Sequence, residues 1–389
     1  MKTLDDFYLK EKRVLVRVDL NASIINGRVQ SSLRFKEHAK TIKELSRKGV
    51  KVVILAHQGK KGKKDYLESL KQHSEILSRL MDKKVKYVDD LFGKVAIKSI
   101  QEMKRGDIIL LKNVRSWNGE TENLSSVKHS KSRFVQNLKN YFDLFVQDAL
   151  SVCHRSHASI VGFAKVLPCC AGRVLENELR EIKKIKIKIK KPFILILGGR
   201  KTEDYIELIK KYVNERKVDS ILTTGFLSFL GCISKGVNFG LKNKILSEEL
   251  KLISKLKKFQ NKFVYPVDFA VDVSGKRKEL KIEEFPSEYD ILDIGSETIK
   301  EYAKIIKNAK TIFVKGSPGN YEKKNFEKGT KMILQEVGKS KGFSLVGGGD
   351  TLTAVDKYKI KGINHISLSG GALLKYLGGE KLPGLEVLK

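Results

Sequence analysis

Short apolar runs of strand length recur along the chain, and segments with apolar residues at helical spacing lie between them. Many of the runs are rich in β-branched residues, which pleated strands favour. They span residues 14–20, 52–56, 85–88, 108–111, 145–149, 193–197, 221–224, 263–267, 291–294, 312–314, 343–346 and 365–368. The intervening helical patterns include residues 36–47, 67–81, 132–141 and 323–336. This alternation predicts an α/β fold of doubly wound parallel sheets, with helices on both faces.

Two domains are expected, because about a dozen strands would overfill one sheet and 389 residues exceed one ordinary core. We place an N-terminal domain at residues 1–170 and a C-terminal domain at 171–359. The pattern at 171–186 predicts a helix. Residues 185–190 alternate Ile and Lys, which fits a strand, yet they also keep Ile at helical spacing. We favour a helix that continues into a connector.

A glycine-rich turn follows the strand predicted to end at residue 346. Gly347 to Gly349 allow a tight backbone turn, and Asp350 and Thr351 stand where a helix would begin. Such a turn directs free N–H groups and the positive end of a helix dipole at one spot, which suits a phosphate. A plain strand-to-helix turn with a capping Asp is the alternative, since single glycine loops are common.

Ligands of parallel sheets bind beyond the carboxyl ends of the strands, so residues at those positions are candidate site residues. In the first half of the chain they are Asp19, Asn21, Arg34, His57, Gln58, Gly59, Lys60, Arg115, Asp148, His154, Arg155 and His157. A small, highly anionic substrate matches this set, because Arg pairs with carboxylate and phosphate through two parallel hydrogen bonds. Any one of them could serve only the surface or a cap, but the same polarity recurs at successive strand ends.

Glycines dominate the corresponding positions in the second half. They are Gly198, Gly199, Gly225, Gly316, Gly319, Gly347, Gly348, Gly349, Gly370 and Gly371. Repeated glycines at strand ends suit close approach of the backbone to a nucleotide. The Walker pattern, a complete G-x-G-x-x-G after the first strand and the G-x-S-x-G of serine hydrolases are all absent from the sequence.

The composition is that of a globular protein, with 41% hydrophobic and 31% charged residues and a net charge of +32. The lysines are spread over the whole length, which favours a solvated surface. A polyanionic substrate is also compatible, because a basic field concentrates phosphates. The sequence contains no aromatic RNA-binding motif and no basic zipper, so we expect no specific nucleic-acid partner.

Compartment and redox state follow from a few further features. No apolar segment reaches the roughly 20 residues of a membrane span, and the charged N-terminus is unlike a secretory signal. The four cysteines match no zinc or disulfide framework. We therefore expect reduced thiols in a cytoplasmic protein without membrane contact.

Several motifs follow one another in a recognisable order. They are Arg17-Val18-Asp19-Leu20-Asn21, Ala56-His57-Gln58-Gly59-Lys60, Asp148-Ala149 with His154-Arg155-Ser156-His157-Ala158-Ser159, Gly198-Gly199-Arg200-Lys201, Pro266-Val267-Asp268-Phe269, Leu292-Asp293-Ile294-Gly295, Gly347-Gly348-Gly349-Asp350-Thr351 and Leu382-Pro383-Gly384-Leu385. Together they resemble the motifs of the phosphoglycerate kinase family over nearly the whole chain, with a look closer to its archaeal members.

The resemblance implies reversible phosphoryl transfer between 1,3-bisphosphoglycerate and ADP, giving 3-phosphoglycerate and ATP in glycolysis and gluconeogenesis, with Mg²⁺. It implies two domains that close about a hinge helix or connector at residues 171–190. A C-terminal segment, 360–389, would pack back on the N-terminal domain. It also implies a cytoplasmic monomer whose partners are these small molecules.

Motif by motif, the resemblance implies a role for individual residues. Phosphoglycerate would be bound by Asp19, Asn21, Arg34, His57, Gly59, Lys60, Arg115 and Arg155. The nucleotide would be bound by Gly199, Arg200, Lys201, Gly225, Leu292, Glu322, Gly348, Gly349, Asp350 and Thr351. Asp350 would also bind the magnesium ion, and the catalytic set would be Arg34, Lys201, Gly349 and Gly371.

The chain departs from the family pattern at several positions. Lys60 stands where Arg is usual, Arg200 replaces a small residue, Tyr205 replaces a second Lys, Lys315 replaces an Asn, and Ser369 interrupts a glycine motif. Two alternatives therefore stay open. One is a catalytically impaired relative that binds nucleic acid, against which the retained Arg34, Lys201 and Asp350 argue. The other is a kinase for another small acyl phosphate, for which Lys60 and Gln58 are the positions to test.

Overall fold

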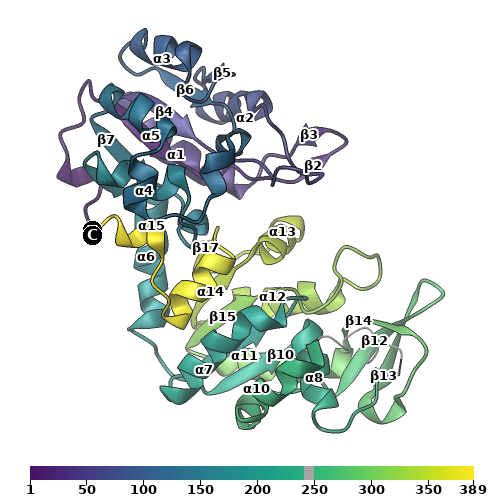
Figure 1. Cartoon of the computed structure of the whole chain (residues 1–389). Coiled ribbons are helices and arrows are strands. Elements are labelled where there is room, and N and C mark those ends of the chain that lie inside the picture. Colours follow the sequence, from purple (N-terminus) through teal and green to yellow (C-terminus); the bar gives the residue numbers. More distant parts are fainter. Residues whose placement is uncertain (241–248) are drawn as a thin grey trace. The chain divides into compact units, whose positions relative to one another are not determined.

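The computed structural model describes residues 1–240 and 249–389, which form two compact units (Figure 1). Unit 1 comprises Met1–Arg180 and Lys381–Lys389, and unit 2 comprises Glu181–Glu380. Each unit is described by itself below. The division falls within helix α6 (Arg173–Lys186), later than the boundary expected after residue 170. The chain rejoins unit 1 at Lys381, whereas we expected it to return from residue 360.

Unit 1 is built on a six-stranded sheet in the order β5-β6-β4-β1-β7-β8, with every neighbouring pair parallel. Its strands are β1 (Arg13–Arg17), β4 (Lys51–Leu55), β5 (Lys86–Val88), β6 (Ile108–Leu111), β7 (Leu144–Gln147) and β8 (Cys169–Ala171). Its helices are α1 (Leu33–Arg47), α2 (Lys71–Met81), α3 (Lys94–Gln101), α4 (Ser126–Ser130), α5 (Arg133–Leu138), the start of α6, and α15 (Pro383–Glu386). A short hairpin pairs β2 (Ile24–Ile25) with β3 (Arg28–Val29).

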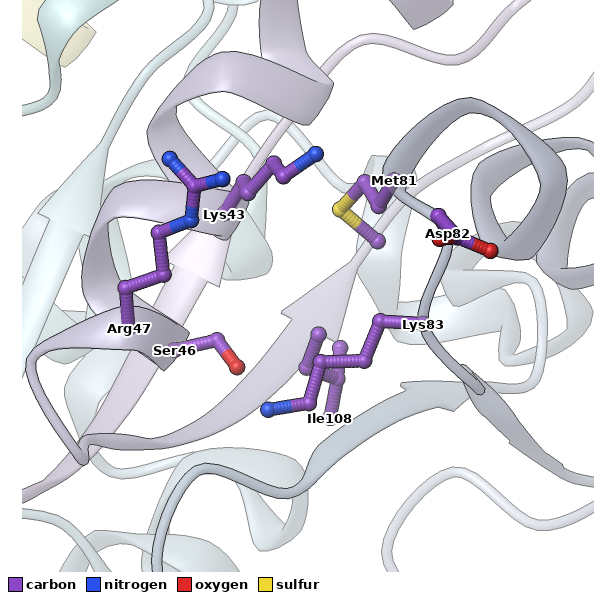
Figure 2. A pocket seen from close by; sticks show the side chains of 7 residues that line it. All are labelled: Lys43, Ser46, Arg47, Met81, Asp82, Lys83 and Ile108. Atoms are coloured by element: carbon purple, nitrogen blue, oxygen red, sulfur yellow. The ribbon is translucent and has the colours of Figure 1, made fainter.

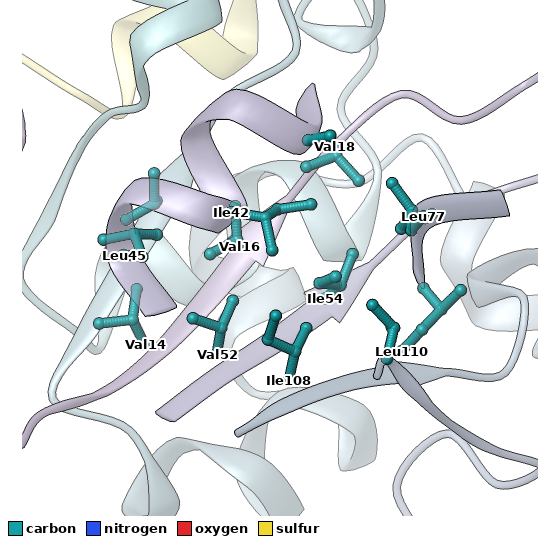
Figure 3. Close-up of a cluster of buried hydrophobic side chains, with 14 of the residues drawn as sticks. Val14, Val16, Val18, Ile42, Leu45, Val52, Ile54, Leu77, Ile108 and Leu110 are labelled. Atoms are coloured by element: carbon teal, nitrogen blue, oxygen red, sulfur yellow. The ribbon is translucent and has the colours of Figure 1, made fainter. Parts of the chain in front are cut away.

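Both faces of this sheet are buried, which explains why its strands are continuous apolar runs. Val14 and Val16 of β1 pack with Ile42 and other residues of α1 and α2 in one cluster (Figure 3). Leu15, between them, packs in a second cluster that includes Phe134 of α5. Successive side chains of a strand point to opposite faces. An uninterrupted V-L-V run therefore supplies a core on each side.

Unit 2 contains a second six-stranded parallel sheet, in the order β11-β10-β9-β15-β16-β17. Its strands are β9 (Phe193–Leu197), β10 (Ser220–Thr223), β11 (Phe263–Val264), β15 (Thr311–Lys315), β16 (Phe343–Gly347) and β17 (His365–Ser367). Its helices include α7 (Ile206–Asn214), α8 (Gly225–Ile233), α10 (Ile253–Lys257), α11 (Ser296–Asn308), α12 (Lys328–Lys339), α13 (Gly349–Lys357) and α14 (Gly371–Gly378). The prediction of an α/β fold with two parallel sheets is confirmed.

Unit 2 also carries an antiparallel sheet that the sequence reading did not anticipate. It joins β12 (Asp268–Val273), β13 (Lys276–Lys281) and β14 (Asp290–Ile294) in the order β13-β12-β14. We expected β14 to belong to the parallel alternation, which was wrong. Strand β13 was missed because its sequence K-R-K-E-L-K is mostly exposed and has only one buried apolar residue. Ser274 and Gly275, both with positive φ, form the tight turn before it.

The segment from residue 171 to β9 is a helix followed by a connector. Ala171 ends strand β8, and α6 runs from Arg173 to Lys186. The Ile–Lys alternation beyond it forms no strand, and residues 188–190 have no regular structure before β9. None of the helices in the described part of the chain is long and apolar enough to cross a membrane.

Candidate active site

Asp19 is the buried anchor of a polar cluster at the carboxyl ends of the unit 1 strands. Its carboxylate accepts hydrogen bonds from the Asn21 backbone N–H at 3.0 Å and the Ser151 hydroxyl at 2.6 Å. The Arg34 Nε atom lies 3.4 Å from the same carboxylate. Arg34 belongs to the first turn of α1, and its Nη1 donates to the Asn21 carbonyl at 2.8 Å. These contacts hold Arg34 in one orientation at the strand ends.

Asp19 remains charged in this setting. Burial raises the pKa of its carboxyl group, but attraction by Arg34 and the hydrogen bonds from Ser151 and the Asn21 backbone outweigh burial and hold the pKa below its ordinary value. The carboxylate therefore offsets part of the positive charge around it and leaves the guanidinium groups oriented.

His57 follows β4 and is almost fully buried. Its Nδ1 atom lies 3.2 Å from Nη2 of Arg17, whose Nε donates to the Ser159 hydroxyl at 2.9 Å. Since a guanidinium can only donate, Nδ1 accepts and the proton of the neutral ring is on Nε2. Burial, followed by repulsion from Arg17, lowers the pKa of His57 well below its usual range. His57 is therefore a neutral donor through Nε2.

A tight turn at Gly59 is held from several sides. The Asn21 Oδ1 atom accepts the Gly59 N–H at 2.7 Å, and Arg115 donates to the Gly59 carbonyl. Gly59 has a φ of +65°, and a Cβ there would lie 2.2 Å from the carbonyl oxygen of Asp65. Only glycine fits this place. Lys60, the next residue, shares the turn and has an exposed side chain.

Gln58 is buried beneath the same turn and is fully engaged there. Its amide exchanges two hydrogen bonds with the Ala22 backbone, at 2.9 and 3.0 Å, and donates to the Asp65 carbonyl at 2.9 Å. These contacts give Gln58 a structural role in holding the loop after β1 to the turn after β4. That role removes the reason to suspect it of selecting the substrate.

Guanidinium groups outnumber carboxylates in this cluster. Burial, with repulsion from Arg155 and Arg17, lowers the pKa of Arg115 to about 10, and burial lowers the pKa of Arg155 as well. The buried Glu120 accepts the Ser159 hydroxyl at 2.6 Å and the Ser159 N–H at 2.9 Å. Together with Asp19 it compensates only part of the positive charge. A bound anion would compensate the rest.

The structure thus brings together most of the residues predicted for this site. Hydrogen bonds or an ion pair join Asp19, Asn21, Arg34, Gly59 and Arg115. His57 is hydrogen-bonded to Arg17, and Arg155 is attracted by Asp19 and Glu120. Lys60 belongs to the Gly59 turn only. Our reading assigned no role to Arg17 or Glu120. Arg17 could have been noticed as a charged residue ending an apolar strand, but Glu120 carries no local signal.

In unit 2, glycine turns at the ends of β9, β10 and β15 lie against one another. Gly198 N–H donates to the Lys315 carbonyl at 2.9 Å, and Gly199 N–H donates to the Ser317 carbonyl at 2.9 Å. A Cβ at Gly225 would lie 2.5 Å from the Gly199 nitrogen. A Cβ at Gly198 would lie 2.2 Å from the Thr224 hydroxyl oxygen, so packing requires glycine at 198 and 225, whereas Gly199 is favoured by its φ of +77°.

Two helix N-termini meet open space beside these turns. Gly348 is the N-cap of α13 with a φ of +104°, and a Cβ at Gly370 would lie 3.8 Å from its Cα. At Gly349 and Gly371, the first residues of α13 and α14, a Cβ would meet nothing within 4 Å. The N–H groups of a helix's first turn have no partner within the helix, and a positive helix end with open space beside it is suited to phosphate.

The other predicted nucleotide residues are arranged around this place. The Thr351 hydroxyl accepts the Gly316 N–H at 3.0 Å and so joins α13 to the turn after β15. The Leu292 carbonyl accepts the Asn320 N–H at 2.7 Å, next to the glycine turn of residues 316–319. The side chains of Arg200, Lys201, Glu322 and Asp350 are exposed.

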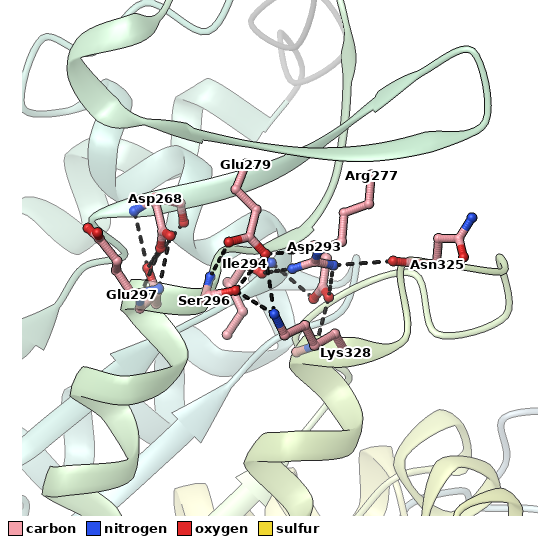
Figure 4. Close-up of polar contacts among 11 residues, drawn as sticks. Asp268, Arg277, Glu279, Asp293, Ile294, Ser296, Glu297, Asn325 and Lys328 are labelled. Atoms are coloured by element: carbon pink, nitrogen blue, oxygen red, sulfur yellow. Dashed lines mark hydrogen bonds and ion pairs between the residues drawn. The ribbon is translucent and has the colours of Figure 1, made fainter.

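A buried ion pair supports the far side of that turn (Figure 4). Asp293 of β14 accepts Nη1 of Arg277 at 2.8 Å and the Gly329 N–H at 2.7 Å. A Cβ at Gly319 would lie 2.0 Å from its Oδ1, and one at Gly329 2.2 Å. Asp293 therefore packs against both the glycine turn and the start of α12. The Leu292-Asp293-Ile294-Gly295 motif therefore positions the backbone of the glycine turn and of the start of α12.

A magnesium ion fits this arrangement only together with a nucleotide. Within residues 1–240 and 249–389, no group of three or more His, Cys, Asp and Glu is placed to hold a metal ion. Asp350 offers one exposed carboxylate in the first turn of α13. Mg²⁺ is usually bound by one or two carboxylates together with substrate phosphates. Asp350 would supply such a carboxylate.

A cavity of about 220 Å³ in unit 1 lies elsewhere (Figure 2). It is lined by Lys43, Ser46, Arg47, Met81, Asp82, Lys83 and Ile108. Ile108 is the first residue of β6, so the cavity lies at the amino-terminal ends of the strands. It is separate from the cluster around Asp19.

Comparison with known proteins agrees with this geometry. The family model described as "Phosphoglycerate kinase" matches residues 4–380. Phosphoglycerate kinase of Methanothermus fervidus is 40% identical over 397 residues, covering 100% of this chain and 96% of that protein. The enzyme of Pyrococcus furiosus is 38% identical over 400 residues, covering 100% and 97%.

Solved structures are similar over the same extent. The crystal structure of phosphoglycerate kinase from Pyrococcus horikoshii OT3 superposes with a TM-score of 0.95 at 35% identity, covering 100% of this chain and 98% of that chain. The structure from Coxiella burnetii gives 0.80 at 29% identity, with 100% and 98% coverage. The chain therefore belongs to the phosphoglycerate kinase family.

Proposed function

We propose that this chain transfers a phosphoryl group reversibly between 1,3-bisphosphoglycerate and ADP, giving 3-phosphoglycerate and ATP. The observation that carries the proposal is the cluster in which Asp19 orients Arg34 while Asn21 and Arg115 hold the Gly59 turn. This cluster is cationic and directional, as a small substrate with two phosphate groups requires. Family membership supports the same reaction.

On the phosphoglycerate side, the guanidinium groups of Arg34, Arg115 and Arg155 bind the substrate's anionic groups. His57 donates from Nε2, because its Nδ1 accepts from Arg17. Asp19 and Asn21 fix these donors, and the Gly59 turn presents Lys60 beside them. Preorganised donors of this kind do not reorient during the reaction, which is what lowers the barrier.

On the nucleotide side, the glycine turns at Gly199 and Gly225 and the helix N-termini at Gly348 and Gly371 line the phosphate path, and Leu292 and Glu322 contact the nucleoside. Thr351 secures the start of α13. Asp350 would hold Mg²⁺, which when bound neutralises phosphate charge.

For this reaction the protein has to position the substrates and stabilise the charge of the transferred group. The substrate's own carboxylate, or ADP in reverse, is the nucleophile, so no general base is required. Arg34, Lys201 and the N–H of Gly349 stabilise the charge that spreads over the transferred group. We also infer that the two domains close about residues 171–190 and exclude water during transfer. The family resemblance supports a monomer that works in the cytoplasm.

The test is a magnesium-dependent assay of ATP with 3-phosphoglycerate, in which hydroxylamine traps the acyl phosphate. Turnover that requires both substrates is expected, and kcat should fall about 100-fold or more in Arg34→Ala and in Lys201→Ala, since each removes a charge that meets the transition state. Lys94→Ala, an exposed change at the start of α3, serves as the control. Near-normal turnover in both site variants would overturn the assigned roles, and no turnover of the unmodified chain would overturn the reaction.

A further inference from the structure

Lys315, the last residue of β15, extends across the glycine turn that precedes α13. A Cβ placed on Gly348 would lie 2.6 Å from the Lys315 Nζ and 2.9 Å from its Cε. The ammonium therefore lies over the N-cap of α13. This is the positive end of a helix, where a cation is unfavourable and an anion is favoured.

The surroundings of this ammonium compensate its charge only from a distance. Among residues 1–240 and 249–389, no carboxylate makes an ion pair with it; Asp350 and Asp204 attract it from longer range, and Lys201 repels it less strongly. Burial also lowers the pKa of Lys315, because the charged ammonium loses hydration in the interior. The Lys315 ammonium and the N-terminus of α13 thus meet at one turn. A bound anion would relieve the repulsion between them.

Tyr205 contacts the backbone of Lys315 at the end of β15. Its hydroxyl donates to the Gly198 carbonyl and lies 3.2 Å from the Lys315 carbonyl. In the family pattern, position 205 often carries a second Lys and position 315 an Asn. This chain has an uncharged ring at 205 and an ammonium at 315. Because the Tyr205 hydroxyl contacts the Lys315 backbone, the loss at one position and the gain at the other both concern the end of β15.

We propose that Lys315 binds the terminal phosphate groups of the nucleotide at the Gly348 turn and supplies, from β15, the ammonium that Tyr205 does not. This rests on the proposed function, since it takes the bound anion to be ADP or ATP. Lys315 is then a phosphate-binding residue at a position where the family pattern has Asn. Its partner group is the β-phosphate of ADP, which AMP lacks.

The test compares binding of ADP and AMP by calorimetry in EDTA, and again with Mg²⁺. Lys315→Met, which keeps the length of the side chain, should weaken ADP binding at least ~10-fold, the loss of one charge-assisted hydrogen bond, and leave AMP binding unchanged. Lys315→Arg should retain most of the affinity. Lys310→Met removes an exposed charge just before the opposite end of β15 and should change neither.

A double variant tests the exchange of charge itself. Tyr205→Lys combined with Lys315→Asn should recover ADP affinity that Lys315→Asn alone loses. Thermal unfolding of each variant verifies that it is folded, and Lys315→Gln replaces Lys315→Met if the latter is not. Unchanged ADP affinity in the neutral variants, or equal loss for ADP and AMP, would overturn the proposal.

The binding and turnover experiments separate the two proposals. If ADP binding depends on Lys315 but the chain transfers no phosphoryl group to 3-phosphoglycerate, the proposed reaction fails and the role of Lys315 stands. If turnover occurs and ADP affinity is unchanged in the Lys315 variants, the proposed reaction stands and the role of Lys315 fails. If the chain binds no nucleotide, both are wrong.

Discussion

His38 joins Asp19 to Asp148 through the interior of unit 1. Its Nε2 accepts the Asp19 backbone N–H at 3.3 Å, and its Nδ1 lies 2.9 Å from Asp148 Oδ2. Because Nε2 accepts, the ring donates from Nδ1 to the carboxylate. The other oxygen of Asp148 accepts the Val174 N–H at 2.9 Å, in the first turn of α6. The loop that orients Arg34 is therefore connected to the helix proposed as the hinge.

Replacing His38 with Phe should disturb this connection. The change leaves the Asp19 N–H and the Oδ2 atom of the buried Asp148 each without its His38 partner, which should cost about 2–4 kcal/mol of unfolding free energy. The KM for 3-phosphoglycerate should rise while the KM for ATP does not. Urea denaturation and steady-state kinetics measure the two effects. Thr41→Val, in the same helix, removes a buried hydroxyl without a partner among the described residues and is the control. Equal behaviour of the two variants would contradict the inferred role.

Gly59→Ala should damage phosphoglycerate binding through a backbone clash. A Cβ at this site would lie 2.2 Å from the Asp65 carbonyl oxygen, so the turn must move away from Asn21 and Arg115. We expect kcat/KM for 3-phosphoglycerate to fall at least ~10-fold, since displaced donors lose their geometry.

The matched control is Gly62→Ala, three residues further along. Gly62 also has a positive φ, +81°, but a Cβ there would meet nothing within 4 Å. It should lose only about 1 kcal/mol from the left-handed conformation and retain normal kinetics. Normal kinetics in both variants would show that the Gly59 turn can move without affecting the site.

His73 should make the stability of the protein depend on pH. Its Nε2 lies 3.1 Å from the Gln58 Oε1, its Nδ1 is buried without a partner among the described residues, and burial lowers its pKa to about 4 from 6.5. Between these values the unfolded chain binds the proton and the folded chain does not. Stability should therefore be complete above about pH 6.5 and fall as the pH is lowered towards 4.

The size of this effect is measurable with a variant that does not titrate. Between pH 7 and pH 5, the unfolding free energy of the unmodified chain should fall by about 2 kcal/mol more than that of His73→Gln, whose amide can still donate to Gln58. Urea denaturation at both pH values measures the difference. Parallel pH dependence in the two proteins would exclude a neutral, buried His73.

Arg277→Met should weaken nucleotide binding from a distance. Arg277 donates to Asp293 at 2.8 Å and to the Ile294 carbonyl at 2.8 Å, and its loss leaves Asp293 as a buried charge without a cation. Breaking such a pair costs about 3–5 kcal/mol. The glycine turn that packs on Asp293 should loosen, so the KM for ATP should rise and that for 3-phosphoglycerate should stay. Lys278→Met, exposed on the same strand, is the control. An unchanged KM for ATP would show that Asp293 does not support the nucleotide site.

The local sequence pattern was enough to predict the buried strands and the glycine turns at their ends. The V-L-V run of β1 shows burial on both faces, because adjacent side chains point in opposite directions. The glycine turns were visible as glycine at strand ends. The motif around Asp19 predicted that several site residues lie at one sheet edge. Their roles in binding and catalysis stay predictions.

Local sequence could not show which polar groups meet across long separations. His38 and Asp148 are 110 positions apart, and Glu120 and Ser159 are 39 apart, yet each pair is buried and hydrogen-bonded. A strand such as β13, with little buried apolar surface, carries no periodic signal at all.

The fold class, the two parallel sheets and the family could be predicted from apolar periodicity, strand-end glycines and ordered motifs along the chain. The same reading showed Lys315 as a departure from the family pattern. Where that departure leads depends on the folded chain, which lays the Lys315 side chain across Gly348 and joins the Lys315 backbone carbonyl to the Tyr205 hydroxyl. The reason is physical: the energy of a buried charge depends on what surrounds it in space, and adjacent strands of a parallel sheet bring together residues that lie far apart in the sequence.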